Sequence, residues 1–73
     1  MKKKITIDEL IPLLKKGWVA MDKDGQWWWN SRKPYLYLTM GCYDNHRGQW
    51  SRLNCFNIAP FDGDWKDSLR KVK

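Results

Sequence analysis

Apolar and polar residues near the start of the chain alternate with the period of a helix. Within the segment TIDELIPLLKK, residues 6–16, the apolar side chains recur at i, i+3, i+4 and i+7: Ile7, Leu10, Ile11 and Leu14. A single apolar stripe of this kind predicts an amphipathic helix. Thr6 and Glu9 have the spacing of a capping box, and Ile5, just before the cap, is placed to pack on Leu10.

Two residue types in this segment modify the predicted helix. Pro12 lacks the N–H that would bond to the carbonyl of Asp8, so we expect a kink or a start nearer Asp8. Lys15 and Lys16 suit the negative C-terminal end of a helix dipole. Gly17 follows them, where the residue after a helix is commonly glycine, and we expect it to end the helix.

The next segment, WVAMDKDGQWWWN, changes to the two-residue period of a strand and predicts a β-hairpin around an Asp-Gly turn. Two registers are compatible with that turn. A two-residue loop at 24–25 would pair Lys23 with Gln26. A three-residue loop at 23–25, with its glycine in the left-handed conformation, would pair Asp22 with Gln26.

The three-residue loop is favoured because it sorts the side chains by polarity. Neighbouring side chains of a strand point to opposite faces. In this register the apolar face carries Val19, Met21, Trp27 and Trp29, and the more polar face carries Ala20, Asp22, Gln26, Trp28 and Asn30. We therefore expect Trp27 and Trp29 in the core, and Trp28 facing outward beside Arg32 and Tyr37.

The segment YLYLTM, residues 35–40, also alternates and predicts a strand. One face would carry Leu36, Leu38 and Met40, and the other Tyr35, Tyr37 and Thr39. Residues 44–48, DNHRG, have the composition of a loop. Residues 49–58 have the content of a strand, but their apolar side chains fall on both faces.

The last segment predicts a short element after the turn at 62–64. Asp64 can cap a helix in which Trp65, Leu69 and Val72 fall at i, i+4 and i+7. A terminal strand is the alternative for the same residues. The sequence leaves these two open.

Together these elements predict one small α+β domain over residues 1–73. The N-terminal helix packs on one face of a three- to four-stranded antiparallel sheet, with a short C-terminal helix or strand. The other face of the sheet is expected to be wet or to meet a partner. Domains of this size bury little core, and assembly into a homo-oligomer is one common way to gain stability.

Positive charge is concentrated at the two ends of the chain. The formal net charge is +6 at pH 7. Residues 1–4 and 70–73 hold this whole excess, because basic and acidic residues are equal in number between them. Runs of like charge at chain ends are usually solvated tails rather than shaped sites.

The sequence carries no recognisable catalytic motif, so we expect a protein that is not an enzyme and that uses no cofactor. It has neither a glycine-rich phosphate loop nor a nucleophile elbow. Cys42, His46 and Cys55 could suggest zinc, but a structural zinc site needs four ligands. The basic start is not followed by the apolar core of a signal peptide, and no stretch is long enough to span a membrane. We therefore expect a cytoplasmic protein with reduced thiols, and a Cys42–Cys55 disulfide is not favoured.

Binding chemistry is better supported than catalysis. The expected wet face and its loops interleave aromatic and cationic side chains: Trp28, Arg32, Lys33, Tyr35, Tyr37, Arg47, Trp50 and Arg52. An aromatic ring can stack on a nucleobase while a guanidinium bonds to phosphate oxygens. The same residue types also dominate protein–protein hot spots. The pattern thus leaves three interpretations open: a nucleotide or nucleic-acid site, a protein-docking face, and a second small core or dimer seam.

Two segments carry a resemblance to known proteins. LLKKGWVAMDKDG and FDGDWKDSL, on either side of a Trp-rich hairpin, resemble small uncharacterised proteins of bacterial phages, prophages and integrative elements. The element order and Asp64-Trp65 are also similar in layout to phage anti-Thoeris sponge proteins. The resemblance implies no binding residues for this chain.

The resemblance implies a role in counter-defence in the cytoplasm of a bacterial host. Such proteins inhibit an immune system by sequestering a nucleotide signal or by blocking a defence protein or nucleic-acid complex such as CRISPR–Cas. The leading hypothesis is stoichiometric binding of an anionic nucleotide or nucleic acid at the aromatic–basic site. The alternatives are a protein–protein inhibitor that docks on a defence complex, and a general nucleic-acid-binding accessory protein that acts through its basic tails.

Overall fold

The computed structural model describes residues 4–45, 47–54 and 57–73. The elements in chain order are the helix α1 (Ile7–Leu10), the 3₁₀ turn η1 (Ile11–Leu13), the strands β1 (Gly17–Met21), β2 (Trp27–Asn30), β3 (Tyr35–Tyr37), β4 (Cys42–Asp44) and β5 (Trp50–Arg52), the 3₁₀ turn η2 (Trp65–Asp67), and β6 (Arg70–Val72). They confirm the predicted α+β class, with a larger share of strand than of helix.

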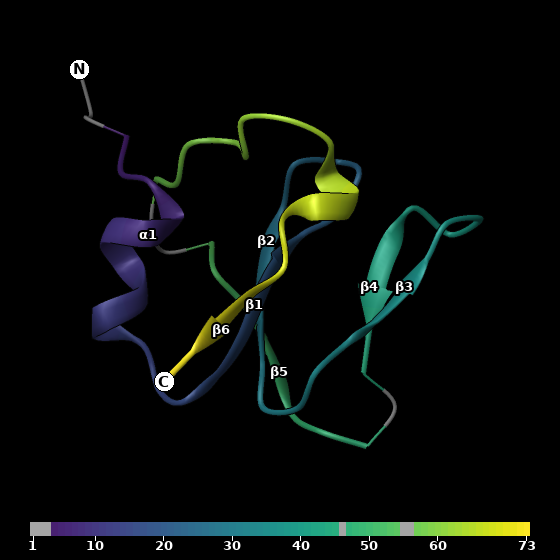
Figure 1. Cartoon of the computed structure of the whole chain (residues 1–73), viewed down its shortest axis with the longest axis horizontal. Helices are drawn as coiled ribbons and strands as arrows, with labels where there is room; N and C mark the ends of the chain where they lie inside the picture. Colours follow the sequence, from purple (N-terminus) through teal and green to yellow (C-terminus); the bar gives the residue numbers. More distant parts are fainter. Residues whose placement is uncertain (1–3, 46, 55–56) are drawn as a thin grey trace.

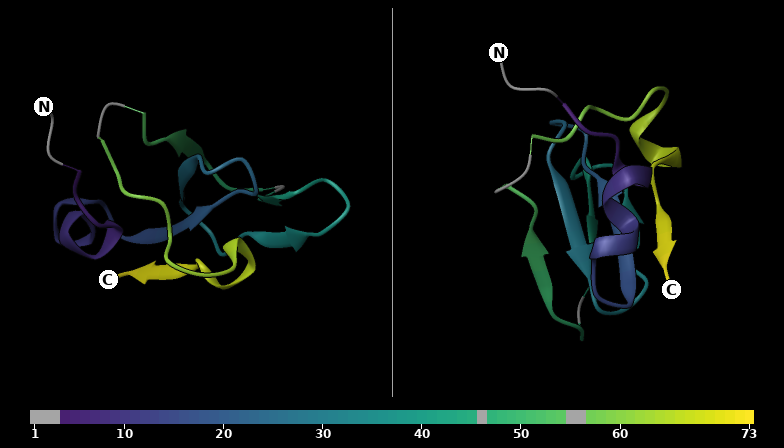
Figure 2. Two further views of the ribbon diagram at one scale, coloured as in Figure 1. Left: turned by 90° about the horizontal axis from the view of Figure 1, so that it is seen from above. Right: turned by 90° about the vertical axis from the view of Figure 1, so that its left-hand side faces the viewer.

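The helix, the main sheet and a separate hairpin lie in successive layers (Figure 1; Figure 2, left). The main sheet is four-stranded and antiparallel, in the order β5-β2-β1-β6. Helix α1 covers one face. The two-stranded β3–β4 hairpin stands on the side of the other face. That face is therefore not simply the wet surface that the pattern predicts, and Ala20 and Asn30 on it are buried.

The β1–β2 hairpin has the predicted three-residue loop. Met21 pairs with Trp27, and the Asp22 N–H donates to the Gln26 carbonyl at 3.0 Å. Gly25 takes a φ of +88°, in the left-handed region that glycine enters at little cost. This register places Trp28 on the opposite face from its two tryptophan neighbours.

The core lies between α1 and the main sheet. Trp27 is fully buried there, and its indole N–H donates to the Ala59 carbonyl at 3.2 Å. Trp29 packs at the edge of the core, half-buried, and donates to the Lys15 carbonyl at 2.9 Å. The other buried apolar residues of the core are Ile7, Leu10, Val19, Met21, Leu53 and Val72.

The N-terminal helix is shorter than the apolar stripe predicts. The capping box is present, because the Glu9 N–H donates to Thr6 Oγ1 at 3.2 Å and the Glu9 side chain accepts from the Thr6 N–H. The α-helix nevertheless ends at Leu10, and Pro12 lies in the 3₁₀ turn η1, because proline cannot donate the next helical bond. Gly17 does not cap the helix. It begins β1, where a Cβ would collide with the backbone of Asn30.

The C-terminal residues belong to the fold, so the prediction of a solvated basic tail at 70–73 is wrong. Asp64 caps η2 as predicted, with its carboxylate accepting from the Lys66 N–H at 3.1 Å. The strand β6 then pairs with β1, and Val72 is buried in the core. The helical turn and the terminal strand, predicted as alternatives, occur one after the other.

The strand predicted at 35–40 ends early. β3 stops at Tyr37, and residues 38–41 form the turn of the β3–β4 hairpin, where Gly41 takes a φ of +68°. The apolar face of the predicted strand therefore meets solvent. Leu38 is 62% exposed and Met40 is 74% exposed.

Candidate ligand-binding site

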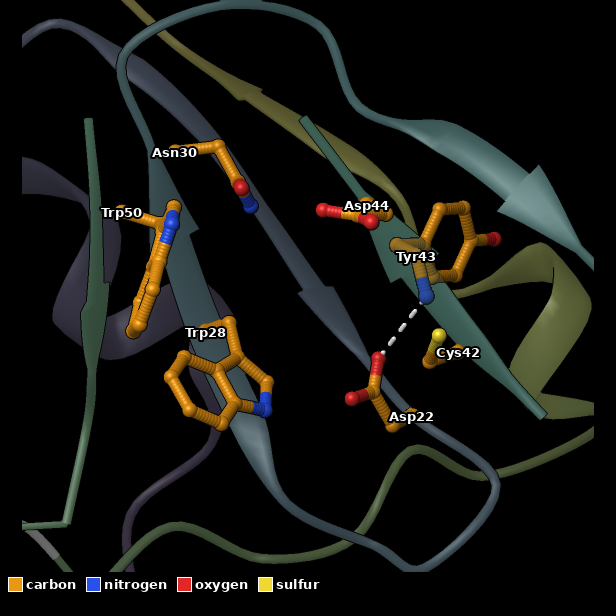
Figure 3. Close-up of a pocket in the computed structure, with 7 residues that line it drawn as sticks. All are labelled: Asp22, Trp28, Asn30, Cys42, Tyr43, Asp44 and Trp50. Atoms are coloured by element: carbon orange, nitrogen blue, oxygen red, sulfur yellow. Dashed lines mark hydrogen bonds between the residues drawn. The ribbon is translucent and has the colours of Figure 1, made fainter. Parts of the chain in front are cut away.

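A hollow lies between the main sheet and the β3–β4 hairpin (Figure 3). Its lining residues are Asp22, Trp28, Asn30, Cys42, Tyr43, Asp44 and Trp50. Its volume is about 200 Å³. That is below the roughly 300–1,000 Å³ of pockets for drug-sized ligands, so the hollow would take one ring or side chain of a larger ligand. We call it the aromatic–acidic hollow.

Tryptophan forms one side of this hollow. Trp28 comes from β2, and Trp50 comes from β5, where it pairs with Asn30 and so shares the same face of the sheet. The two indoles meet edge to face, with ring centroids 5.4 Å apart. Trp50 is 61% exposed, so much of its ring is open to a ligand.

Two carboxylates stand on the opposite side (Figure 3). Asp22 Oδ1 accepts a hydrogen bond from the Tyr43 N–H at 3.0 Å, and Asp44 Oδ1 accepts from the Asn45 N–H at 2.7 Å. Burial raises the pKa of Asp22, and the neighbouring Asp24 and Asp44 charges raise this pKa further, against the bond from Tyr43 that lowers it. Ionisable groups whose charged form is disfavoured by their surroundings are common at functional sites.

The indole N–H of Trp28 is a donor without a well-formed hydrogen bond among the described residues. Its Nε1 is covered from solvent, and no acceptor there meets normal bond geometry. The N–H is turned toward the Asp22 carboxylate and acts to lower the pKa of that acid, but it is not aligned with an oxygen (Figure 3). A buried donor left in this state costs about 1–3 kcal/mol. The hollow thus places an unsatisfied donor next to a carboxylate.

The β4 side of the hollow is held in place by contacts with the main sheet and with η2. The backbone N–H of Tyr43 donates to Asp22, and the Tyr43 hydroxyl donates to the Lys66 carbonyl at 2.6 Å. The Tyr43 ring packs edge to face on Trp65, with centroids 5.9 Å apart. At the hairpin turn, the Lys23 N–H donates to the Gly41 carbonyl at 2.9 Å. These bonds fix the separation between the carboxylates and the tryptophans.

A second hollow lies at the segments that follow β2 and β4, and we call it the basic hollow. Its lining residues are Arg32, Lys33, Tyr35, Asn45 and Arg47. Tyr35 pairs directly with Asp44 across the β3–β4 hairpin, so their side chains share one face. Asp44 lines the aromatic–acidic hollow and Tyr35 lines the basic hollow, so this pair brings a residue of each hollow side by side.

The loop that carries Arg47 is organised by a buried amide. Asn45 Oδ1 accepts from the Gly48 N–H at 2.6 Å, and Asn45 Nδ2 donates to the Gln49 carbonyl at 3.2 Å. The Gln49 N–H in turn donates to Ser31 Oγ at 2.7 Å. The loop after β4 is thereby tied to the loop after β2, and both contribute cations to the basic hollow.

Six of the eight predicted site residues line one or other of these two hollows. Trp28 and Trp50 line the aromatic–acidic hollow, and Arg52 lies opposite Trp28 in the β2–β5 pairing. The basic hollow collects Arg32, Lys33, Tyr35 and Arg47. Tyr37 pairs with Cys42 in the β3–β4 hairpin. The hollow that Trp28 lines includes neither Arg32 nor Tyr37, the neighbours predicted for it.

Sequence reasoning missed the acidic side of the site. The preferred register already placed Asp22 on the same face as Trp28, and that signal could have identified it. Asp44 and Cys42 had no such signal, because the pattern predicts a strand at 35–40 and a loop from Asp44 onward, not a hairpin that folds over the main sheet.

The possible zinc ligands are only partly described. Cys42 is a free thiol, and burial together with the charges of Asp22 and Asp44 raises its pKa. His46 and Cys55, the other residues of the zinc and disulfide hypotheses, lie outside the described residues. Within residues 4–45, 47–54 and 57–73, no group of three or more His, Cys, Asp or Glu is placed to hold a metal ion.

No helix in the described part of the chain is long and apolar enough to cross a membrane. Comparison with known proteins found no matching family model, no matching curated protein and no matching solved structure. The function is therefore inferred from the geometry of the two hollows.

Proposed function

We propose that this protein binds an anionic nucleotide, or the end of a single-stranded nucleic acid, in stoichiometric amounts and without converting it. The observation that carries the proposal is the pairing of Tyr35 with Asp44, which brings a residue of each hollow side by side. A base would lie against Trp28 and Trp50, where stacking contributes about 1–3 kcal/mol per base. The phosphate would lie in the basic hollow, where an arginine can bind it with paired hydrogen bonds.

The opposite charges of the two hollows favour a ligand with two chemically different ends. A simple anion would be attracted to Arg32, Lys33 and Arg47 but repelled by the neighbouring carboxylates. A simple cation would be attracted to Asp22 and Asp44 but repelled by the basic hollow. A nucleotide has a flat ring rich in hydrogen-bond donors and a separate phosphate, so it can use both hollows at once.

We also propose that this binding serves counter-defence in the cytoplasm of a bacterial host. The support for this part is the resemblance to small phage and mobile-element proteins, together with the anionic nucleotide signals that such proteins sequester. Stoichiometric capture of a signal needs a tight site and no catalytic group. A homo-oligomer would add binding sites without changing this mechanism.

A thermal-shift panel of linear and cyclic nucleotides tests the proposal. A ligand at 100 times its Kd stabilises the folded state by about 2.7 kcal/mol. For a domain of this size, that raises the Tm by about 10–20 °C. Arg47→Ala should remove much of the shift, whereas Lys16→Ala, an exposed lysine beyond the helix, should keep it. A panel without any shift at high ligand excess would contradict the proposal.

A second candidate function, inhibition of a defence protein by docking, is supported by the β3–β4 hairpin. Leu36, Leu38 and Met40 of this hairpin are all exposed, and exposed apolar surface often marks a protein interface. The test is a pull-down from cells that express a defined CRISPR–Cas complex. Capture of that complex by the wild type and its loss with Met40→Asp would favour docking. Equal recovery with both proteins would count against it.

The third hypothesis is nucleic-acid binding through two basic tails. One of these, at the C-terminal end, is not a tail, because Arg70–Val72 is a strand of the main sheet. What remains is the segment at 1–4. Binding through it should weaken steeply with added salt, since counterions are released on binding. Affinity that survives removal of that segment would eliminate the hypothesis.

A further inference from the structure

The aromatic–acidic hollow presents hydrogen-bonding groups of fixed polarity. The ionised Asp22 carboxylate can only accept, and the Trp28 indole can only donate. The Tyr43 N–H occupies Asp22 Oδ1, and the other carboxylate oxygen is turned toward the Trp28 side of the hollow (Figure 3). Asp44 adds a further acceptor. The Trp28 Nε1 is covered from solvent and faces Asp22, so the groups left for a ligand are carboxylate acceptors, and the ligand must bring hydrogen-bond donors.

Guanine has such donors on one edge. Its N1–H and N2 amino group are neighbouring donors that a carboxylate can accept together, and its O6 is an acceptor beside them. Adenine has a bare N1 lone pair at the equivalent place, which would face the carboxylate and be repelled. Asp22 would therefore accept from N1–H and N2–H.

We infer that the aromatic–acidic hollow is a guanine-selective base site, with Asp22 as the residue that determines the selectivity. This inference rests on the proposed nucleotide-binding function and deepens it by naming the base. The volume of about 200 Å³ is suited to one base, and the exposed ring of Trp50 can stack on it. The sugar and phosphate then extend past Asp44 and Tyr35 into the basic hollow.

Asp22→Asn separates recognition from folding. Asparagine keeps an oxygen that can accept from the Tyr43 N–H, so the contact that holds β4 is preserved. It replaces the other oxygen by an amino group, which donates where guanine also donates. A residue needed only for the fold would tolerate this change without any effect on which base is bound.

The experiment is isothermal titration of the full chain with guanosine, inosine and adenosine 5′-monophosphates. Inosine differs from guanosine only in lacking the N2 amino group. Loss of one hydrogen bond to a charged group lowers affinity about tenfold or more. We expect guanosine monophosphate to bind at least tenfold more tightly than inosine monophosphate, and adenosine monophosphate to bind more weakly still.

The variants make the result specific to Asp22. Asp22→Asn should bring the affinity for guanosine monophosphate down to that for inosine monophosphate or below. Asp62→Asn, at an exposed aspartate away from the hollow, is the matched control and should change neither quantity.

The outcomes separate the inference from the function on which it rests. Equal affinity for the three nucleotides, or a preference for adenine, would overturn guanine selectivity while leaving nucleotide binding intact. The same holds if Asp22→Asn folds, binds, and keeps the wild-type preference. If no nucleotide binds to the wild type at millimolar concentration, the proposed function is wrong and the inference falls with it.

Discussion

Ser68 joins η2 to the middle of the main sheet, and its removal should destabilise the fold by a measurable amount. Its side chain is 0% exposed. The β1–β6 pairing stops at Val19 and Arg70, and beyond that point Ser68 Oγ accepts from the Met21 N–H at 2.8 Å. The same hydroxyl can donate to the Trp65 carbonyl at 2.7 Å. Ser68→Ala would leave the buried Met21 N–H without this acceptor.

The size of the effect follows from that unsatisfied donor. A buried polar group that loses its partner costs about 1–3 kcal/mol. In a domain of 60–100 residues, each kcal/mol changes the Tm by about 4–8 °C. We therefore expect Ser68→Ala to lower the Tm by about 5–20 °C. In urea unfolding the midpoint should fall while the slope stays the same, because the surface exposed on unfolding is unchanged.

The assay is urea unfolding followed by both tryptophan fluorescence and circular dichroism. Ser51→Ala, at an exposed serine in the edge strand β5, is the matched control and should stay within about 0.5 kcal/mol of the wild type. A change as small as that for Ser68→Ala would refute the importance of this contact. Independent unfolding of the β3–β4 hairpin would show as transitions that differ between the two probes.

Three further predictions concern the fold around the site. The folded state raises the pKa of Asp22 above its ordinary value of 3.8. At a pH above the raised pKa, the ionised carboxylate therefore lowers the free energy of unfolding, and this destabilisation disappears as the pH falls toward 3.8. In urea unfolding, the free energy of unfolding of Asp22→Asn should therefore exceed that of the wild type by more at about pH 7 than at about pH 4. An equal difference at both pH values would contradict a raised pKa of Asp22 in the folded state. Deletion of residues 70–73 should abolish cooperative unfolding in calorimetry because it removes β6 and the buried Val72, whereas an unchanged Tm would restore the solvated-tail interpretation. Gly17→Ala should lower the Tm by several degrees, since the added Cβ meets the Asn30 carbonyl and the Trp29 indole; an unaffected Tm would show that the strands separate easily there.

Local chemistry made part of this fold predictable from the sequence. The register of the β1–β2 hairpin follows from Gly25 and from the polarity of neighbouring side chains, and both act within a few residues. The capping box at Thr6 and Glu9 is local in the same sense. Because the register was right, the separation of Trp28 from its tryptophan neighbours was right as well.

The features that depend on contacts between distant segments were not predictable in this way. Alternation at 35–40 predicts a strand, but it does not say which sheet the strand joins. The pairing of Tyr35 with Asp44 is decided by how the hairpin packs on the rest of the protein. For the same reason, the sequence showed the cations and aromatic residues of the site but not the carboxylates beside them, or the division into two hollows.

The central claim is that one ligand occupies both hollows, and the effect of a phosphate group on binding tests it most directly. The measurement is calorimetric titration of the wild type and Arg47→Ala with guanosine and with guanosine 5′-monophosphate. Charge-assisted hydrogen bonds to a phosphate should raise the wild-type affinity about tenfold or more over the nucleoside. In Arg47→Ala most of this gain should disappear, while binding of the nucleoside itself stays the same. Equal affinity of the wild type for both compounds, or a phosphate gain that Arg47→Ala leaves intact, would contradict binding across the two hollows.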